Sequence, residues 1–421
     1  MARIVMKFGG TSVADLDRIK NVARFVRAEV NNGHSVVVIV SAMAGQTNHL
    51  VGLTQEAGEP DSALDMRGME YDAIVSSGEQ VTSGLLALVL QQQGYRARSW
   101  QGWQIPIRTD NAHAKARIKD IPDINLGPAI DSGEVAIVAG FQGVTEDGRI
   151  ATLGRGGSDT TAVAIAAALN AERCDIYTDV DGVYTTDPRI AKTAKRIPRI
   201  SYEEMLEMAS VGAKVLQTRS VELAMAYKVP LRVLSSFDDP DFSVGNDAIG
   251  TIICDEDEIV EQHIVSGITP SRDEAKISLI AVPNEPGRAA RIFILLAEAN
   301  VNIDMIVQSP ARSPDAANIS FTMSDGELAR AAEVLNAAKD EIGFSDLNTD
   351  SSIAKVSVIG VGMKSHAGVA SVMFKTLAER GINIQNISTS EIKISVLIDS
   401  EYTELAVRAL HQAYGLDSTA A

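Results

Sequence analysis

The sequence contains few residues of the kinds that build disulfide or metal frameworks. Its 421 residues include two cysteines, Cys174 and Cys254, and six histidines that lack ligand spacing. The two cysteines lie far apart and form no metal or redox motif, so we expect a reducing environment and no structural zinc site. The aspartate-rich segment 178–189 lacks the closing glutamate of an EF-hand. We therefore predict no protein-built metal site.

Positive charge and long apolar runs are also scarce. Lys and Arg number 38 against 55 Asp and Glu, which gives a net charge of −17. A nucleic-acid partner would need a basic surface, so none is expected, and an anionic substrate must be attracted by local positive groups. The first residues show no signal-peptide pattern, and no apolar run approaches the length of a membrane span. We expect a soluble cytoplasmic protein without a membrane partner.

Alternating strands and helices fill the first part of the chain. Residues 4–8 predict a strand, 15–31 a helix, and 35–40 a continuous apolar strand. This succession implies a right-handed parallel βαβ unit. Ligands of such sheets gather at the carboxyl ends of the strands.

Lys7, Gly9, Gly10 and Ser41 stand at these strand ends. An ammonium beside two glycines is suited to neutralising a phosphate. The lysine precedes the glycines, however, so KFGGTS is not a Walker A loop, and no G-x-G-x-x-G is present. As an isolated signal the lysine is weak, because a surface lysine before a turn would explain it equally well.

The glycine-rich segment 152–159, TLGRGGSD, is more informative. It follows the apolar strand 135–139 and precedes the Ala-rich helix 160–170. Its glycines allow close approach of a ligand, and the free N–H groups of the helix start favour an anion. Arg155 adds a clamp for a carboxylate or phosphate, and Asp159 adds a negative charge beside it. A tight turn capped by a side chain would not explain the arginine, so a functional loop is favoured.

Three further charged positions remain open when the residues are considered alone. Glu79, in the predicted helix 72–93, is either a solvated charge or a partner for a substrate ammonium. Tyr184 and Arg189 follow a strand in an aspartate-rich loop and fit a nucleotide site, with the ring against a base or ribose and the arginine toward phosphate. Lys214 offers one more cation.

The ordered set of motifs resembles the aspartokinases of the amino-acid kinase superfamily. KFGGTS, SAM at 41–43, SSGEQ at 76–80, TLGRGGSDTTA and TDVDGVYTTDPR occur in this order along the chain. The resemblance implies an α/β fold for residues 1–250, a three-layer amino-acid kinase fold with a mainly parallel central sheet. It also implies transfer of the γ-phosphoryl group of MgATP to the side chain of L-aspartate, the first step toward lysine, threonine and methionine.

The resemblance assigns roles residue by residue. Lys7 would bridge the transferred phosphoryl group, and Asp159 would orient the Lys7 side chain. Arg155 would pair with the α-carboxylate of aspartate and Glu79 with its α-ammonium, and Ser41 and Thr47 would add polar contacts. The expected ATP contacts are Lys7, Gly9, Gly10, Thr178, Asp179, Tyr184, Arg189 and Lys214. ATP oxygens and water would hold most of the Mg²⁺ coordination.

An internal repeat occupies the last 160 residues or so. With Gly287 aligned on Gly368, Leu296-Ala297-Glu298 falls on Leu377-Ala378-Glu379, and Asn302-Ile303 falls on Asn383-Ile384, without a gap. Each copy predicts a ferredoxin-like βαββαβ unit. The copies resemble paired ACT domains, which we place at 264–340 and 352–421.

ACT domains bind amino-acid effectors, here expected to be lysine, threonine or both, and a homo-oligomer formed through these domains is expected. The residues implied to bind effectors are Asn284, Gly287, Asn302, Ile303, Asp304, Gln308, Ser365, His366, Ala367, Gly368, Val369, Asn383, Ile384, Thr389, Ser390 and Glu391. Ala367 departs from the family pattern, which has proline there. No methionine lies between Met225 and Met305, so an internal ATG start is not available there, and a separate regulatory subunit would have to begin at a valine or leucine codon.

Two alternatives remain. One is a related kinase that acts on glutamate, carbamate, acetylglutamate or UMP, which the ACT pair and the SSGE segment disfavour. The other is a catalytically silent amino-acid sensor, which the intact charged set of Lys7, Glu79, Arg155 and Asp159 disfavours.

Overall fold

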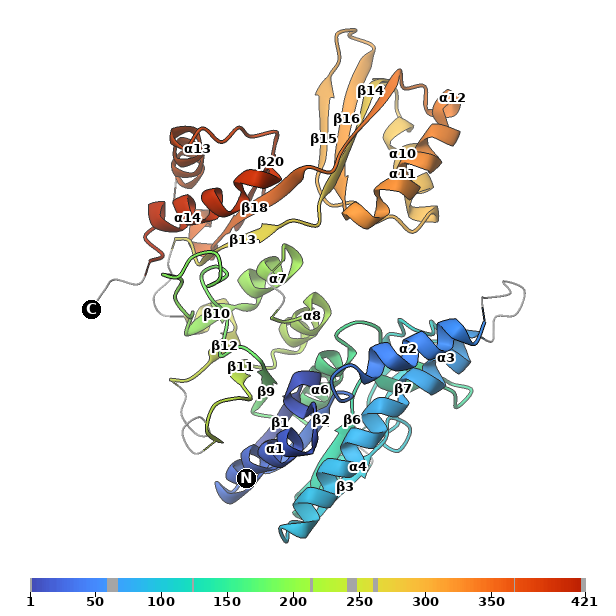
Figure 1. Cartoon of the computed structure of the whole chain (residues 1–421), viewed down its shortest axis with the longest axis vertical. Helices are drawn as coiled ribbons and strands as arrows, with labels where there is room; N and C mark the ends of the chain where they lie inside the picture. The colour runs from blue at the N-terminus through green and yellow to red at the C-terminus, as the bar shows by residue number, and fades with distance from the viewer. Residues whose placement is uncertain are drawn as a thin grey trace. The chain divides into compact units, whose positions relative to one another are not determined.

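The chain forms two compact units (Figure 1). A computed structural model describes residues 2–58, 67–122, 125–212, 215–240, 248–259, 264–366 and 368–417. The first unit comprises Met1–Tyr184, Arg196–Ser210 and Lys214–Glu261, and the second comprises Thr185–Lys195, Val211–Ala213 and Gln262–Ala421.

The first unit is built on an eight-stranded sheet. Its strands, in spatial order, are β10 (Arg199–Ser201), β12 (Thr251–Cys254), β11 (Leu231–Ser235), β9 (Arg173–Thr178), β1 (Arg3–Phe8), β2 (Ser35–Val40), β6 (Val135–Ala139) and β3 (Ala97–Trp100). Every neighbouring pair is parallel except β11 and β12. The continuous apolar runs of β2 and β6 are buried, as expected for parallel strands that are covered on both faces. The predicted mainly parallel sheet is confirmed.

Helices cover both faces of this sheet. On one face, α1 (Leu16–Asn31) packs against α4 (Ser77–Gln92), and Met6 and Phe8 of β1 join their core. Because alternate residues of a strand point to opposite faces, Lys7 points to the other face, where Asp159 of α6 (Gly157–Ala168) meets it. Helix α6 also contacts α8 (Thr218–Tyr227).

Four short strands form a second sheet in this unit. In spatial order they are β5 (Ile118–Asp120), β4 (Arg108–Thr109), β7 (Gln142–Val144) and β8 (Ile150–Thr152). The sequence predicted that the glycine-rich loop follows β6 directly. In the structure the hairpin β7–β8 comes between β6 and the loop. The other α-helices described in this unit are α2 (Gln46–Glu56), α3 (Arg67–Val75), α5 (Leu126–Asp131) and α7 (Tyr202–Ser210).

One helical stretch of this unit is long and apolar enough to cross a membrane by length and composition. It spans Gly68–Gln92, and half of its apolar window is buried inside the unit. The stretch comprises most of α3 and all of α4, and α4 packs on α1, β3 and β6. Its apolar character is therefore that of a core helix.

The second unit contains two four-stranded antiparallel sheets. One has the spatial order β15 (Ile306–Pro310), β16 (Ala316–Met323), β14 (Ala275–Pro283) and β17 (Asp346–Asp350), with helices α10 (Arg288–Glu298), α11 (Leu328–Ala337) and α12 (Lys339–Ile342). The chain order of these elements is the predicted βαββαβ ferredoxin-like pattern, and α10 and α11 pack on the apolar face of the sheet.

The other sheet takes one strand from an unexpected place. Its order is β13 (Gly267–Ser271), β18 (Ile353–Ile359), β20 (Lys393–Asp399) and β19 (Asn386–Thr389), covered by α13 (Val369–Glu379) and α14 (Thr403–Ala413). No strand follows α14 in the described residues, and β13, which precedes the whole of the other sheet in the chain, pairs with β18 at the edge of this sheet. The expected boundary at 264–340 therefore placed this strand in the wrong sheet.

Two further boundaries differ from those expected. Strand β12 (Thr251–Cys254) pairs within the main sheet, so the first unit extends beyond residue 250. Residues 185–195, which interrupt the first unit in sequence, belong to the second. There Thr185 O accepts from Ile268 N at 2.7 Å and Thr185 Oγ1 lies 2.9 Å from His411 Nε2.

Candidate functional site

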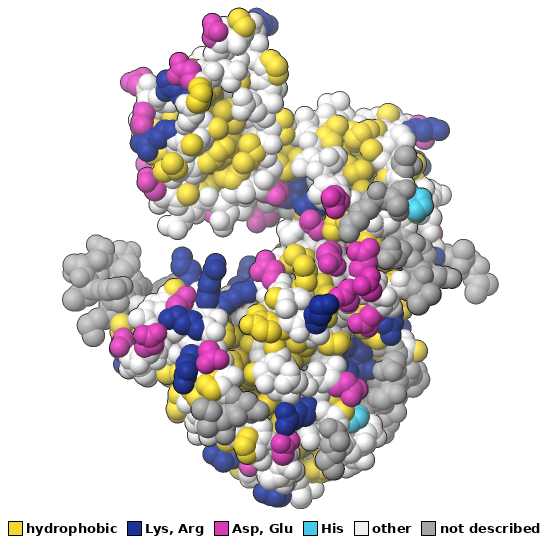
Figure 2. Space-filling model, turned by 180° about the vertical axis from the view of Figure 1, so that it is seen from behind, with side chains coloured by type: hydrophobic (Ala, Val, Ile, Leu, Met, Phe, Trp, Pro, Cys, Tyr) yellow, Lys and Arg dark blue, Asp and Glu magenta, His cyan; other side chains and the backbone are white. Residues whose placement is uncertain are grey.

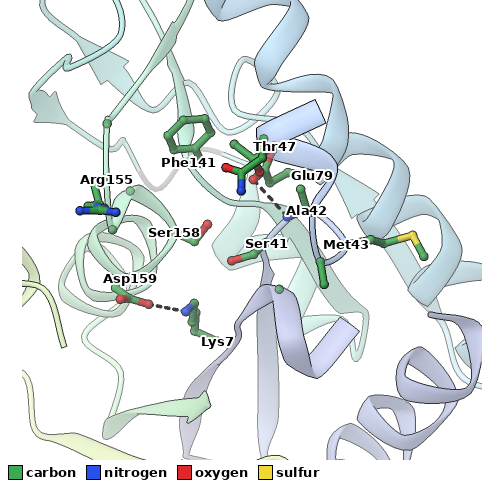
Figure 3. A pocket seen from close by; sticks show the side chains of 17 residues that line it. Lys7, Ser41, Ala42, Met43, Thr47, Glu79, Phe141, Arg155, Ser158 and Asp159 are labelled. Atoms are coloured by element: carbon green, nitrogen blue, oxygen red, sulfur yellow. Dashed lines mark hydrogen bonds and ion pairs between the residues drawn. The ribbon is translucent and has the colours of Figure 1, made fainter. Parts of the chain in front are cut away.

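A pocket of about 350 Å³ lies at the carboxyl ends of β1 and β2, where the parallel sheet predicted a ligand. It is also bounded by the start of α6 and by α4 (Figure 3). All of the predicted catalytic and substrate residues line it, namely Lys7, Ser41, Thr47, Glu79, Arg155 and Asp159, together with Gly10, which was predicted to contact ATP. Residues distant in sequence therefore meet at one place, as predicted.

Lys7 and Asp159 form an ion pair in the pocket. Lys7 Nζ lies 2.5 Å from Asp159 Oδ1, and each side chain is 11% exposed. A pair so withdrawn from water holds both groups in one geometry and leaves the remaining ammonium protons for an anionic ligand. Gly9 lies beside the pair, since a Cβ at Gly9 would stand 3.4 Å from Lys7 Nζ. The arrangement fixes a cation where a phosphate could bind.

Glu79 is a buried carboxylate with one free oxygen. It lies in the first turn of α4, and its side chain is buried, with 3% of the residue exposed. Ala42 N donates to its Oε1 at 3.1 Å, whereas its Oε2 is buried without a hydrogen-bond partner in the described part of the chain. Burial raises the pKa of Glu79 to about 7, although the Ala42 N–H opposes the increase. Such an oxygen is available to an ammonium donor.

Arg155 lies on the other side of the pocket from Glu79 (Figure 3). It stands in the glycine-rich loop, where Gly154 and Gly156 have φ of 77° and 72°, values that favour glycine. Gly156 is the N-cap residue of α6, and no side chain caps this helix. Gly157 N donates to Gly154 O at 3.0 Å, whereas the next two N–H groups, those of Ser158 and Asp159, have no hydrogen bond within the described residues and stay available to an anion at the pocket.

Sequence reasoning missed three polar or aromatic residues of the pocket wall, Asn48, Phe141 and Ser158. Ser158, 8% exposed, lies between Arg155 and Asp159 at the start of α6, and Phe141 follows β6. Ser158 receives no role from the sequence. Its place one residue before Asp159 in a helix that starts at the pocket was the available signal. Phe141 carries no sequence signal of this kind, because its location depends on its positive φ of 69° after β6.

The structure does not bring all predicted nucleotide residues to this pocket. Thr178 Oγ1 donates to Asp179 Oδ1 at 3.2 Å, and the Tyr184 hydroxyl donates to Asp181 Oδ1 at 3.0 Å. Arg189 belongs to the second unit, where it pairs with Asp187 at 2.8 Å. Lys214 lies outside the described residues. The nucleotide contacts of these residues therefore stay predictions.

The predicted effector residues follow the internal repeat. Gly287 and Gly368 are the N-cap residues of α10 and α13, with φ of 92° and 104°. The aligned glycines therefore both begin a helix in a left-handed backbone conformation that favours glycine. In the first copy Gln308 Nε2 lies 3.5 Å from Asn284 Oδ1, and Asp304 pairs with Lys355 of β18.

In the second copy His366 Nδ1 lies 2.9 Å from Gly362 O. Ala367 and the side chain of Ser365 lie outside the described residues. The remaining predicted residues fall in three places. Asn302 and Ile303 precede β15, Asn383 and Ile384 precede β19, and Val369, Thr389, Ser390 and Glu391 begin α13 or end β19 and the turn after it. Effector binding by these residues is untested by the geometry.

Comparisons with known proteins agree with this architecture. Residues 2–235 match the Amino acid kinase family, and residues 277–343 and 356–414 each match the ACT domain. The aspartate kinase of Pseudomonas fluorescens and the aspartokinase of Pseudomonas aeruginosa are each 52% identical to the chain, over 100% of its length and 99% of theirs.

Solved structures give the same result. Escherichia coli aspartokinase III in complex with aspartate and ADP has a TM-score of 0.79 and 28% identity, covering 97% of this chain and 99% of that one. The same enzyme in complex with lysine and aspartate has a TM-score of 0.76, covering 97% and 98%. With its pocket, its sheet order and its full-length relatives, the chain belongs to the aspartate kinases, amino acid kinases with two C-terminal ACT domains.

Proposed function

We propose that the chain transfers the γ-phosphoryl group of MgATP to the side-chain carboxylate of L-aspartate, giving 4-phospho-L-aspartate, the first step toward lysine, threonine and methionine in the cytoplasm. One observation carries this proposal. Within the described residues, a buried oxygen of Glu79 has no hydrogen-bond partner, and it lies across the pocket from Arg155, in a wall that also contains the Lys7–Asp159 pair. An α-amino acid carries an ammonium and a carboxylate that fit these two charges.

The proposed division of labour follows from charge and position. Glu79 binds the α-ammonium and Arg155 binds the α-carboxylate of aspartate, while Ser41 and Thr47 add polar contacts at the wall. The side-chain carboxylate then faces Lys7. Phosphoryl transfer needs positioning and neutralisation of charge more than covalent chemistry, so Lys7 stabilises the transferred group and Asp159 holds Lys7 in place.

We propose that Thr178, Asp179, Tyr184, Arg189 and Lys214 bind ATP together with Gly9 and Gly10. The described part of the chain contains no group of three or more His, Cys, Asp or Glu side chains that could hold a metal ion. Of the carboxylates that line the pocket, Asp159 is already paired with Lys7. This donor set fits a Mg²⁺ ion that arrives on the nucleotide and keeps phosphate oxygens and water as ligands. The ion supplies neutralisation of charge on the phosphates.

Regulation by lysine, threonine or both at the ACT domains is proposed on two grounds. Aspartokinase III of E. coli has been solved with lysine. In this chain the ion pair between Asp304 and Lys355 joins the predicted effector turn of one ACT sheet to a strand of the other, and Glu274 also contacts Lys355 at 2.6 Å. A ligand at that turn would act on both sheets.

A homo-oligomer formed through the ACT domains is proposed from their exposed apolar edges. Ile306 of β15 and Ile387 of β19, which are equivalent in the internal repeat, are 53% and 45% exposed on strands at the edges of the two sheets. Hydrophobic side chains gather on the surface of this unit (Figure 2). Apolar edge strands of this kind are suited to pairing with another chain.

The decisive experiment measures ATP-dependent acyl-phosphate formation, trapped by hydroxylamine. We expect product with L-aspartate and none with L-glutamate, and inhibition by lysine, threonine or only both together. Activity that neither lysine nor threonine inhibits would refute the proposed effectors and leave the proposed kinase activity in place. A well-folded protein without activity would support a silent amino-acid sensor, and activity with glutamate would support a related kinase.

A further inference from the structure

The loop that carries Arg155 is held against a second segment of the first unit. Ala116 N donates to Thr152 O at 2.9 Å, so residues 113–116 run beside the end of β8. Closer to the arginine, a Cβ added at Gly154 would lie 3.2 Å from Ala114 O. The position of Arg155 therefore depends on how these two segments are fixed to each other.

A single buried carboxylate fixes them. Asp72 is fully buried. Its Oδ1 accepts from Thr152 Oγ1 at 2.5 Å and from Ala114 N at 3.0 Å, and its Oδ2 lies 2.7 Å from His113 Nδ1. Because an ionised carboxylate only accepts hydrogen bonds, the histidine nitrogen donates. Both oxygens are thus committed to the two segments beside the Arg155 loop.

Asp72 also belongs to the helical stretch that carries Glu79. It lies in α3, and Ser76 N donates to Asp72 O at 3.1 Å, so helical hydrogen bonding continues toward α4. Asp72 and Glu79 are seven residues apart in the sequence, about two helical turns, and so project from the same side of the helix about 10 Å apart along its axis. The helical stretch Gly68–Gln92 thus carries both the proposed contact to substrate, in α4, and an anchor for the opposite wall, in α3.

We propose that Asp72 is a positioning residue that sets the distance between Glu79 and Arg155, and thereby the recognition of the α-ammonium and α-carboxylate of aspartate. The inference rests on the roles proposed above for Glu79 and Arg155. Asp72 is not one of the residues that line the pocket, so it acts through Thr152, Ala114 and the loop that follows. Misplacement of a binding group by about 1 Å is enough to cost about two orders of magnitude in rate.

Asp72→Asn tests the proposal in the full-length enzyme. The amide puts a donor where the carboxylate accepted, so one of the three donors loses its partner. We expect KM for aspartate to increase about tenfold or more, whereas KM for ATP changes less than about twofold. Equal increases in both KM values, or no change in KM for aspartate, would overturn the proposal.

Glu29→Gln is the matched control. Glu29 is also fully buried and also contacts a histidine, His34, at 2.6 Å, but its other partner, Arg173, begins β9, at the end of the sheet opposite the pocket. We expect both variants to lower the thermal transition, and only Asp72→Asn to change KM for aspartate. If the control shifts KM for aspartate equally, the effect is one of general stability and the proposal fails.

A double-mutant cycle with Arg155→Ala separates this inference from the proposed function. If Asp72 acts through Arg155, adding Asp72→Asn to Arg155→Ala gives little further increase in KM for aspartate. If the increases in KM for aspartate caused by the two substitutions multiply in the double mutant, the inference is overturned and the role of Arg155 is kept. An Arg155→Ala variant with unchanged KM for aspartate would overturn both.

Thr152→Val keeps the test decisive should Asp72→Asn not fold. It removes one hydroxyl donor to Asp72 and preserves the shape of the side chain. We expect the same selective increase in KM for aspartate, about threefold, in line with the loss of one modest hydrogen bond. A folded Thr152→Val enzyme with unchanged KM for aspartate would contradict the proposal.

Discussion

The proposed contact of Glu79 with the α-ammonium of aspartate would make substrate binding depend on pH. Burial raises the pKa of Glu79 to about 7, so the free enzyme carries it protonated below that pH and ionised above. Only the ionised form attracts an ammonium. We therefore expect kcat/KM for aspartate to fall as pH drops below 7, approaching tenfold per unit, because this parameter follows the ionisation of the free enzyme.

The control for this pH dependence is Glu79→Gln, measured at saturating MgATP so that ionisation of the nucleotide does not contribute. The amide has no charge to lose, so its kcat/KM for aspartate should be low and flat across the same pH range. A wild-type decline that persists in Glu79→Gln would assign the titration to another group.

Lys7 should matter to turnover more than to nucleotide binding. Its ammonium is held by Asp159 beside Gly9, and in the proposed mechanism it stabilises the charge that develops on the transferred phosphoryl group. Removing one such preorganised donor typically costs about 10²–10³ in kcat. We expect that loss for Lys7→Ala in steady-state kinetics, with ATP affinity by calorimetry changed much less.

Lys20→Ala is a suitable comparison, since Lys20 also pairs with an aspartate, Asp17, but both side chains are largely exposed. Exposed pairs contribute little, so this variant should behave as wild type. Comparable losses in both lysine variants would show that Lys7 has no special role.

At the residue scale, sequence reasoning succeeded where motifs carried the signal. Lys7, Glu79, Arg155 and Asp159 meet at one pocket. It missed Asp72, because a lone aspartate in a helix resembles a solvated charge and its partners His113 and Thr152 lie far away in sequence. Such clusters depend on tertiary packing, which no local pattern records.

The loop and helix around Arg155 form an element with little room for change. Gly156 has φ of 72°, and a Cβ there would meet Cγ and Cβ of Gln217 at 2.1 and 2.6 Å, just before α8. Gly156→Ala therefore forces the loop or α8 to move. We expect kcat/KM for aspartate to fall by about tenfold or more, by the same sensitivity to misplacement, in steady-state assays.

Gly148→Ala is its matched control. Gly148 has φ of 74°, nearly the same strained conformation, but a Cβ there would meet nothing within 4 Å. Both variants should lose about 1 kcal/mol of stability from the left-handed conformation, and only Gly156→Ala should lose activity. Equal activities of the two would contradict a steric role for Gln217.

Element prediction from the sequence was strongest for regular, local signals. Helix α1 begins as expected, with Asp15 as N-cap accepting from Arg18 N at 2.8 Å. The buried strands β2 and β6 were also found. The hairpin β7–β8 was not, since each of its strands has only three residues and too little pattern to recognise.

At the scale of the whole molecule, the pairing of β13 with β18 determines which strands depend on each other for stability. Ile268 of β13 is fully buried in the core that includes β18 and β20. We expect Ile268→Ala to cost about 2–5 kcal/mol. Hydrogen exchange should then show protection lost in β18 and β20, and retained in β14 and β16, although β14 is the nearer neighbour in sequence.

Ile294→Ala serves as the control, because Ile294 of α10 is 49% exposed and truncation there leaves no cavity. It should leave exchange in both sheets nearly unchanged. Loss of protection in β14 and β16 of the Ile268→Ala variant would contradict the pairing of β13 with β18. No periodicity could have predicted this pairing, since a strand's sequence does not identify its partner.

The position of β13 also dictates an order of events during synthesis. Domains form as the chain emerges, N-terminal parts first. The sheet of β14–β17 is contiguous in sequence and can close as soon as β17 is made, whereas the described strand that pairs with β13, β18, is made only later. The entropic cost of bringing β13 and β18 together grows slowly with the length of chain between them. The time before β18 is made therefore matters more than that length. In a nascent chain, residues 267–271 are an unpaired edge and the stretch most open to association with the wrong partner.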